Sequence, residues 1–420
     1  MPRRIERPLR AVICGGSMAG LFIGNMLHRQ GWQVDIYERV DGALNVRGAG
    51  IAGHNEYLPI LKACGISQER TVGIDVEGRT AYDHTGRQIG FHAHPQYLTY
   101  WGLFHDLLRK AFPVSHYHTG IGVEDVTPGI SRSVAHLSNG SSVAADLVIG
   151  ADGIRSRVRE IFAPMIKPEY GGYFAFRGTA PEARLSQPFQ RDMMQRYIWV
   201  FPGDGQFNGY PICGPDYATE PGRRQYTYLW YRPVGDAFMQ DLLTDGHGRT
   251  YEHSIPPPLI RPEHFVALRK HAAALLPPLF AEIVLQAENN MLQPMYDVES
   301  RDIAFGNVCL LGDAAFTARP HVGVGVLKAG QDALELARCL SVHDDVATAL
   351  RAYAHTREPA GCKAVRFSRY LGSFIARALP QPTSDPALQL TPQFLLQTSA
   401  RAVETVGPYL GSRQSLFDAM

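Results

Sequence analysis

Residues 10–38, RAVICGGSMAGLFIGNMLHRQGWQVDIYE, decide the fold of this chain. The apolar run at 10–14 predicts a short buried strand, and the glycine-rich stretch at 15–20 precedes apolar residues with helical spacing. A second strand is expected at 33–37, ending at Glu38. Strand, glycine-rich turn, helix, strand and acidic residue in this order are typical of a βαβ unit that binds a dinucleotide.

The residues of this motif have separate expected roles. Gly15 allows the tight turn, Gly20 lets the helix pack close to the strand, and Glu38 is placed to bind ribose hydroxyls. Backbone N–H groups at the helix start are expected to face the pyrophosphate, and they belong to Ser17, Met18 and Ala19. Ser17 stands where the usual motif has its middle glycine, so it keeps the N–H group but crowds the phosphate slightly.

Residues 306–333, GNVCLLGDAAFTARPHVGVGVLKAGQDA, predict the other end of the same site. A buried strand at 308–311 runs into Asp313, and a helix follows the turn that contains Gly323 and Gly325. A carboxylate at a strand end can accept hydrogen bonds from sugar or ribityl hydroxyls. The helix N-terminus beyond it offers free N–H groups and a partial positive charge. Such a pairing suits a cofactor that is polar along its chain and anionic at one end, as a reduced flavin is.

A third motif, DLVIGADGIRSRVR at 146–159, predicts a strand that ends at Asp152 and a helix rich in arginine. Asn139-Gly140 marks a hairpin turn just before it.

The three motifs together resemble the class A flavoprotein monooxygenases, the p-hydroxybenzoate hydroxylase type, over essentially residues 8–360. Within that family the chain is most similar to the 2,6-dihydroxypyridine and hydroxynicotinate hydroxylases. The similarity lies in short sequence motifs that occur in the same order: GGSMAG at 15–20, FRG at 176–178, YPI at 210–212, the WY pair at 230–231 and RPH at 319–321.

The resemblance implies an α/β fold, with a Rossmann-like FAD-binding domain and an inserted antiparallel-sheet substrate domain. It implies FAD as cofactor and NADPH or NADH as co-substrate. It also implies hydroxylation of a small aromatic ring by O2 through a flavin C4a-hydroperoxide. Residues assigned to the cofactor through this resemblance, besides the N-terminal motif, are Arg47, Asp152, Asp313, Pro320, Gly323 and Gly325.

Composition along the chain predicts the domain limits. Residues 1–180 form the first part of the FAD-binding domain, with a small contribution to the substrate domain near 76–100. Residues 181–295, rich in aromatic residues and proline with alternating strands, form the antiparallel sheet. The second part of the FAD-binding domain spans 296–380. The tail at 381–420 is expected to be one amphipathic helix, packed on the body or on a second subunit of a homodimer.

Two residues are expected to do chemistry on the substrate. His321 follows Pro320 in the loop beside the expected flavin ring, and an imidazole with a pKa near 6.5 can take a hydroxyl proton at neutral pH. The alternative is a loop histidine that bonds backbone or positions Arg319. Tyr210 could hydrogen-bond the ring oxygen, or it could be a packing residue.

Four further residues are expected to bind the substrate, His54, Arg177, Trp230 and Tyr231. Trp230 and Tyr231 are adjacent on one strand, so only one of them can face the pocket. For Arg177 a structural salt bridge is the alternative role.

Three departures from the family pattern concern the cofactor. Val324 and Leu327 stand where the family usually has Gln and Asn, and Trp101 stands where many members have an Arg that touches FAD. Stacking on Trp101 could partly compensate.

Composition excludes several other classes. The net charge of +1 gives no electrostatic footprint for nucleic acid. No apolar run is long enough to span a bilayer, and the N-terminal segment does not fit a signal peptide. Six scattered cysteines without a C-x-x-C motif indicate a reduced, cytoplasmic protein. Histidines with metal-like spacing are interpreted as solvated surface residues, so no metal is expected; they are His84, His92, His94, His116 and His118.

Three functions stay under consideration. The favoured one is an FAD-dependent hydroxylase of a small hydroxylated aromatic such as a hydroxypyridine. The second is a tailoring hydroxylase or epoxidase of a larger natural product, to be separated by pocket size. The third, supported by Val324 and Leu327, is a flavin-binding or flavin-free protein without oxygenase activity. The partners expected are therefore a small aromatic substrate, O2 and NAD(P)H, without nucleic acid or membrane.

Overall fold

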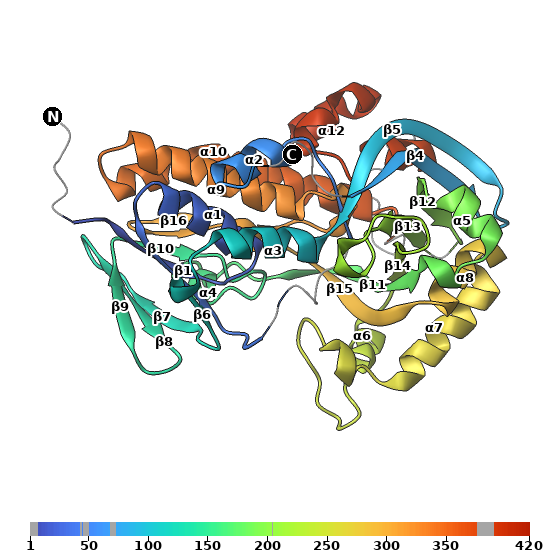
Figure 1. Ribbon diagram of the computed structural model, residues 1–420, viewed down its shortest axis with the longest axis horizontal. Helices are drawn as coiled ribbons and strands as arrows, with labels where there is room; N and C mark the ends of the chain where they lie inside the picture. The colour runs from blue at the N-terminus through green and yellow to red at the C-terminus, as the bar shows by residue number, and fades with distance from the viewer. Residues whose placement is uncertain (1–6, 43, 45–49, 68–72, 204, 376–389) are drawn as a thin grey trace.

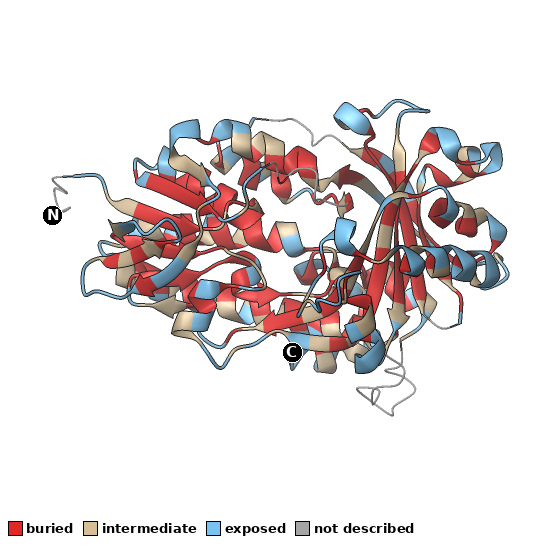
Figure 2. Ribbon diagram, turned by 90° about the horizontal axis from the view of Figure 1, so that it is seen from below, coloured by how far each residue is buried: buried red, intermediate tan, exposed pale blue. Residues whose placement is uncertain are grey.

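A computed structural model describes residues 7–42, 44, 50–67, 73–203, 205–375 and 390–420. Two large sheets stand side by side along the long axis of the molecule, and the long strands β11 and β15 lead from one to the other (Figure 1). Buried residues run along the strands of both sheets and the helices that cover them (Figure 2). Within the described ranges, no helix is long and apolar enough to cross a membrane.

The first sheet has six strands in the order β16-β17-β10-β1-β2-β6. All neighbours pair in parallel except β16 and β17. Its strands are Ala304–Phe305 (β16), Val308–Leu310 (β17), Leu147–Gly150 (β10), Arg10–Cys14 (β1), Gln33–Glu38 (β2) and Tyr117–Thr119 (β6). The three sequence motifs supply β1, β2, β10 and β17, so the predicted Rossmann-like sheet is confirmed.

Helices cover this sheet because their apolar faces match its parallel, fully buried strands. Helix α1 (Met18–Arg29) packs against α9 (Gly325–Val342) and α3 (Trp101–Ala111), and α9 packs against α10 (Val346–Gly372). The short helix α2 (Tyr57–Ala63) packs against α1 and α9, and the short helix α4 (Arg157–Phe162) packs against β10. A three-stranded sheet flanks it, with strands Val123–Thr127 (β7), Ser133–Leu137 (β8) and Ser142–Ala145 (β9).

The second sheet has nine strands in the order β18-β15-β11-β14-β13-β12-β4-β5-β3. It is antiparallel apart from the parallel pair β12–β4. Its strands are Phe316–Thr317 (β18), Glu288–Glu299 (β15), Glu169–Pro181 (β11), Gln225–Pro233 (β14), Gln206–Ile212 (β13), Arg196–Phe201 (β12), Ile74–Asp83 (β4), Gln88–Tyr100 (β5) and Gly50–Ala52 (β3). The sheet therefore includes β3, β11 and β18 from outside residues 181–295.

The outer face of this sheet is closed by helices α5 (Gln187–Met193), α6 (Asp236–Leu242), α7 (Pro262–Leu275) and α8 (Pro278–Leu285). A separate aromatic core fills the space beneath them, and Trp230 lies within it. The inner face of the sheet is left for the site.

The C-terminal tail is not one amphipathic helix as predicted. Its described residues, 390–420, contain α11 (Pro392–Thr398), three single 3₁₀ turns and the short helix α12 (Gln414–Asp418). Ser399, directly after α11, has an extended backbone that ends the helix, and Ala400 then adopts a positive φ of 49°. Glycines at 407 and 411 break the remaining stretch.

Four of the histidines interpreted as solvated surface residues are partly exposed and also have polar partners. His116 and His118 both hydrogen-bond the buried Asp35 (3.0 and 3.2 Å), because the parallel pairing of β2 and β6 brings them together. His92 and His94 face a guanidinium of the C-terminal tail. Only His84 is exposed as expected.

Candidate active site between the two sheets

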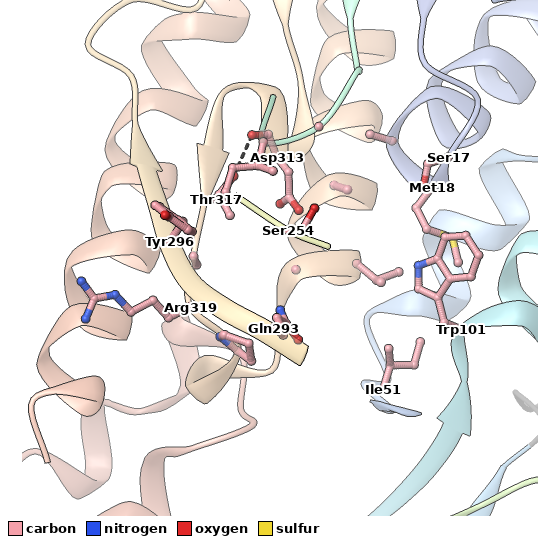
Figure 3. A pocket seen from close by; sticks show the side chains of 18 of the residues that line it. Ser17, Met18, Ile51, Trp101, Ser254, Gln293, Tyr296, Asp313, Thr317 and Arg319 are labelled. Carbon is pink, nitrogen blue, oxygen red and sulfur yellow. Dashed lines mark hydrogen bonds between the residues drawn. The ribbon is translucent and has the colours of Figure 1, made fainter. Parts of the chain in front are cut away.

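A cavity of about 810 Å³ lies between the carboxyl ends of the first sheet and the inner face of the second. The cofactor motifs line one end of it, and strands β11 to β15 line the other. Figure 3 shows Ser17, Met18 and Trp101 on one side of this space, with Asp313 and Thr317 on the other. The cavity thus joins elements that are far apart in the sequence.

The glycine-rich turn has the geometry that a close ligand requires. Gly15 has a φ of +106°, and a Cβ there would clash with the carbonyl oxygen of Ala151. A Cβ on Gly20 would clash with the carbonyl oxygen of Gly15. Ser17 is the N-cap of α1 but makes no side-chain capping bond, so the first N–H groups of the helix are available to an anion.

Glu38 ends β2 and is buried beside this turn. Its two carboxylate oxygens accept hydrogen bonds from the backbone N–H groups of Gly16 and Val40, each at 2.9 Å. Each oxygen has a further lone pair, so Glu38 can hold the turn and still accept a ribose hydroxyl from the cavity that it lines.

Two aspartates bring uncompensated polar atoms to the cavity. Asp152 Oδ2 accepts from the backbone N–H of Arg157 (2.7 Å), whereas its Oδ1 is buried without a partner. Burial raises the pKa of Asp152, although hydrogen bonds, chiefly from Ser156, oppose this. Surrounding protein also raises the pKa of Asp313, whose side chain is open to the cavity, and nearby Lys328 opposes that shift.

A buried ion cluster supports the turn that presents Asp313. Asp332 on α9 pairs with Lys328 (3.3 Å) and with Arg357 on α10 (2.7 Å). The same carboxylate accepts the backbone N–H of Gly312 (3.2 Å). These contacts fix the strand-to-helix connection at which the ribityl chain of a flavin would be held.

His321 lies on the cavity wall between the two sheets and is only 6% exposed. Its Nε2 is 2.7 Å from the hydroxyl of Tyr173, and its ring is 4.7 Å from that of Tyr231. Burial and the nearby Arg319 lower its pKa to about 3. The ring is therefore neutral at pH 7, and it is a much weaker base than the free imidazole that the sequence suggested.

The inner face of the second sheet supplies the remaining predicted substrate residues. Tyr210 lines the cavity, and its hydroxyl donates to the carbonyl of Gly50 (2.7 Å). Arg177 lines it too, with Nη1 donating to Gln293 Oε1 (2.8 Å). Tyr231 faces the cavity whereas Trp230 is fully buried on the other face, as alternation required of one of them.

Other predicted residues lie elsewhere. Trp230 belongs to the outer core, so it cannot touch a ligand in the cavity. His54 lines a second cavity instead, and its Nε2 bonds the carbonyl of Gly323 (3.0 Å). Arg47 lies outside the described residues. Of the two departures in the helix start, Val324 lines the main cavity and Leu327 is part of the core.

Several cavity residues escaped the sequence reasoning, namely Tyr197, Trp199, Gln206, Asn208, Leu229 and Gln293. The sequence pattern could have identified two of them. Gln206 and Asn208 alternate along β13 with the predicted residue Tyr210, so all three share one face of the strand. Three polar atoms on this face of the sheet, Arg177 Nε, Trp199 Nε1 and Gln206 Oε1, are buried without a hydrogen-bond partner.

These observations fit a bound FAD. The glycine cradle and the uncapped helix start match a pyrophosphate, Glu38 matches a ribose, and Asp313 matches a ribityl chain. Buried polar groups normally have partners, so the orphaned Asp152 Oδ1 also indicates a ligand. Among the residues that the structure describes, no group of three or more His, Cys, Asp or Glu could hold a metal ion.

Comparison with known proteins agrees with this geometry. A model described as FAD binding domain-like matches residues 170–297, and one described as FAD binding domain matches residues 262–368. The chain is 27% identical to 2,6-dihydroxypyridine 3-monooxygenase of Paenarthrobacter nicotinovorans over 346 residues, covering 82% of this chain and 86% of that protein.

A second relative, the aurachin C monooxygenase/isomerase of Stigmatella aurantiaca, is 27% identical. The match covers 83% of this chain and 85% of that protein. Among solved structures, 2,6-dihydroxypyridine-3-hydroxylase from Arthrobacter nicotinovorans superposes with a TM-score of 0.82 at 24% identity. That match covers 93% of this chain and 98% of the other. It shows a shared fold.

Proposed function

Because this chain belongs to the class A flavoprotein monooxygenases, we propose that it hydroxylates a small hydroxylated N-heteroaromatic ring such as a hydroxypyridine. FAD would be held by the glycine turn, Glu38 and Asp313, and when bound it supplies the redox chemistry that activates O2. NADH or NADPH would supply the electrons. The chain itself binds and orients the ring, excludes water and controls protons.

The observation that carries this substrate class is the set of orphaned polar atoms on the inner sheet face. Arg177 Nε and Trp199 Nε1 are donors, and Gln206 Oε1 is an acceptor. A ring that offers both an acceptor oxygen and an N–H group can bond the protein donors and the protein acceptor, whereas a purely carbocyclic phenol lacks the ring N–H. Hydroxypyridines, which convert readily to pyridones, present both on one edge.

The size of the cavity supports a small ring. The same space of about 810 Å³ is lined by both the cofactor residues and the substrate residues. FAD would fill much of it, which leaves little room for the larger natural product of the second hypothesis. Aromatic and aliphatic side chains such as Tyr231, Leu229 and Met295 line the remainder and would keep water from the reacting ring.

The test is a substrate screen that follows NAD(P)H oxidation together with product mass. The matched pair is 2,6-dihydroxypyridine and resorcinol, which differ in the ring nitrogen. We expect the pyridine to be hydroxylated with a kcat/KM at least about tenfold higher, as is usual when a buried polar group would otherwise lose its partner. Equal turnover of the pair, or turnover of neither, would contradict the proposed substrate class.

A variant sharpens this test. Gln206→Met keeps the length of the side chain but removes its acceptor. We expect it to reduce the preference for the pyridine over resorcinol while FAD content stays unchanged, since Gln206 does not belong to the cofactor end. A preference that persists in the variant would assign the recognition to another residue.

A further inference from the structure

The hydrogen bond between Tyr173 and His321 indicates which ring nitrogen of His321 carries the proton. Tyr173 Oη and His321 Nε2 are 2.7 Å apart, and Tyr173 is fully buried. In a neutral imidazole one nitrogen donates and the other accepts, and the partner of one sets the role of both. The direction of this hydrogen bond therefore decides what His321 offers to the cavity.

The surroundings of the Tyr173 hydroxyl offer one hydrogen-bond acceptor for its proton. Arg319 lies close, with its guanidinium carbon 5.5 Å from the centre of the Tyr173 ring, but a guanidinium can only donate. On the side of α10, Gly372 packs so closely that a Cβ there would clash with Tyr173 Oη. Among the described residues, His321 Nε2 is the one acceptor recorded for this hydroxyl.

Tyr173 should therefore donate to Nε2, and a neutral His321 must then have its proton on Nδ1. Neutrality is expected, since burial and Arg319 both lower the pKa of this histidine to about 3. Nδ1 makes no hydrogen bond to any described residue, and it is not among the fully buried polar atoms that lack a partner. It is thus the ring nitrogen open to the cavity that His321 lines.

We infer that Tyr173 is a positioning residue that fixes His321 as the Nδ1–H tautomer, so that His321 offers a hydrogen-bond donor, and not a base, to an oxygen of the bound ring. For its ligand this inference rests on the function proposed above. A donor at this place stabilises a ring oxygen that is already anionic or carbonyl-like, which is the form that pushes electron density onto the ring carbons. It replaces the general-base role that the sequence suggested.

Buried contacts hold this arrangement in place. Arg319 Nε donates to Asp297 (2.7 Å), which is fully buried and also accepts from Arg369 on α10 (2.6 Å). The backbone N–H of Ala400 donates to the carbonyl of His321 (2.9 Å). The titratable groups facing the imidazole are therefore Tyr173, Tyr231 and Arg319, and none of them is a carboxylate that would favour a charged ring.

The first experiment needs no substrate. Nitrogen-15 NMR of the FAD-loaded protein labelled in histidine, with His321→Asn to assign the signal, reports the tautomer directly. We expect a proton on Nδ1 and a bare Nε2, unchanged between pH 5 and 8. In Tyr173→Phe, which keeps the ring, the Nδ1–H signal should give way to a mixture of tautomers. An Nε2–H signal in the wild type, or no change in the variant, would overturn the inference.

The second experiment separates donor from base. In His321→Asn the amide can place an N–H group near the position of Nδ1, whereas the carboxylate of His321→Asp offers only acceptors. With 2,6-dihydroxypyridine, we expect Asn to retain at least about tenfold more kcat/KM and coupled product than Asp. A base would give the reverse order, with Asp the more active.

The two experiments also distinguish the inference from the proposed function. If the wild type hydroxylates no ring tested, the proposed substrate is wrong, and the NMR result still decides the tautomer. Unchanged FAD content and circular dichroism in each variant show that the fold is retained.

Discussion

Asp313 illustrates at the scale of one residue how the cavity is prepared for a polar chain. Its carboxylate is open to the cavity while protein around it raises its pKa, so a ligand that donates hydrogen bonds relieves the cost of desolvation. We expect Asp313→Ala to weaken FAD binding by about 1–3 kcal/mol for each hydrogen bond lost, or at least about fivefold in Kd. Quenching of flavin fluorescence on titration measures this.

The matched control is Asp302→Ala, an exposed aspartate that precedes β16 and does not lie on the cavity wall. Its FAD affinity should equal that of the wild type. An Asp313 variant within twofold of the wild type would remove Asp313 from the cofactor site.

At the scale of elements, the start of α1 depends on close packing over β1. A methyl group on Gly20 would clash with the backbone carbonyl of Gly15, which cannot move without opening the turn. A methyl group on Gly24, one turn along the same helix, would meet Ile36 Cδ1 at 2.7 Å, the movable end of a side chain. We therefore expect Gly20→Ala to lose bound FAD and Gly24→Ala to retain it, as measured by the ratio of absorbance at 450 and 280 nm.

One buried arginine of the second sheet makes several hydrogen bonds to the C-terminal segment. Arg79 on β4 is fully buried and donates to the carbonyls of Leu396 (3.0 Å), Ala400 (2.8 Å) and Ser399. Arg79→Met would remove this donor from the carbonyls of Leu396 and Ser399, each at a cost of about 1–3 kcal/mol, whereas Gln96 would still donate to the carbonyl of Ala400. We expect residues 391–413 to become accessible to protease and to exchange their amide hydrogens faster.

Arg87→Met is the control for this prediction, since Arg87 lies on the loop between β4 and β5 and its side chain is exposed. Limited proteolysis of both variants should separate them. Because Ala400 also bonds the carbonyl of His321, release of the segment should increase uncoupled consumption of NAD(P)H as well. Equal resistance of both variants to protease would show that Arg79 does not anchor the tail.

At the scale of the whole molecule, buried neutral histidines should make the protein sensitive to acid. Burial lowers the pKa values of His54, His105, His94 and His321, the last two to about 3. An unfolded histidine titrates near 6.5, so between pH 6.5 and about 3 the unfolded state binds more protons. Stability therefore falls as pH falls through this range.

His321 alone should contribute about 2 kcal/mol to this loss at pH 5, since 1.5 pH units below 6.5 correspond to about 2 kcal/mol. His321→Asn cannot titrate, so its unfolding temperature should drop less than that of the wild type between pH 7.5 and 5 at constant FAD concentration. Calorimetry of both proteins at both pH values measures the difference. Parallel losses would mean that His321 is not held neutral.

The sequence by itself determined the cofactor end of the site. The turn at Gly15, the acid at Glu38 and the turn at Asp313 each lie within one contiguous strand-turn-helix stretch, so local geometry suffices to place them. The alternation of Trp230 and Tyr231 was equally local, because neighbouring residues of a strand must point to opposite faces.

Only the tertiary structure decided which faces meet and what burial does to them. Tyr173, Trp199 and Gln206 come from three strands, and their assembly on one inner face depends on register between strands distant in sequence. The weak basicity of His321 arises from Arg319 and from burial between two sheets, which no local pattern encodes. The position of His54 on another cavity also depends on tertiary structure, because its partner, the carbonyl of Gly323, is 269 residues away along the chain.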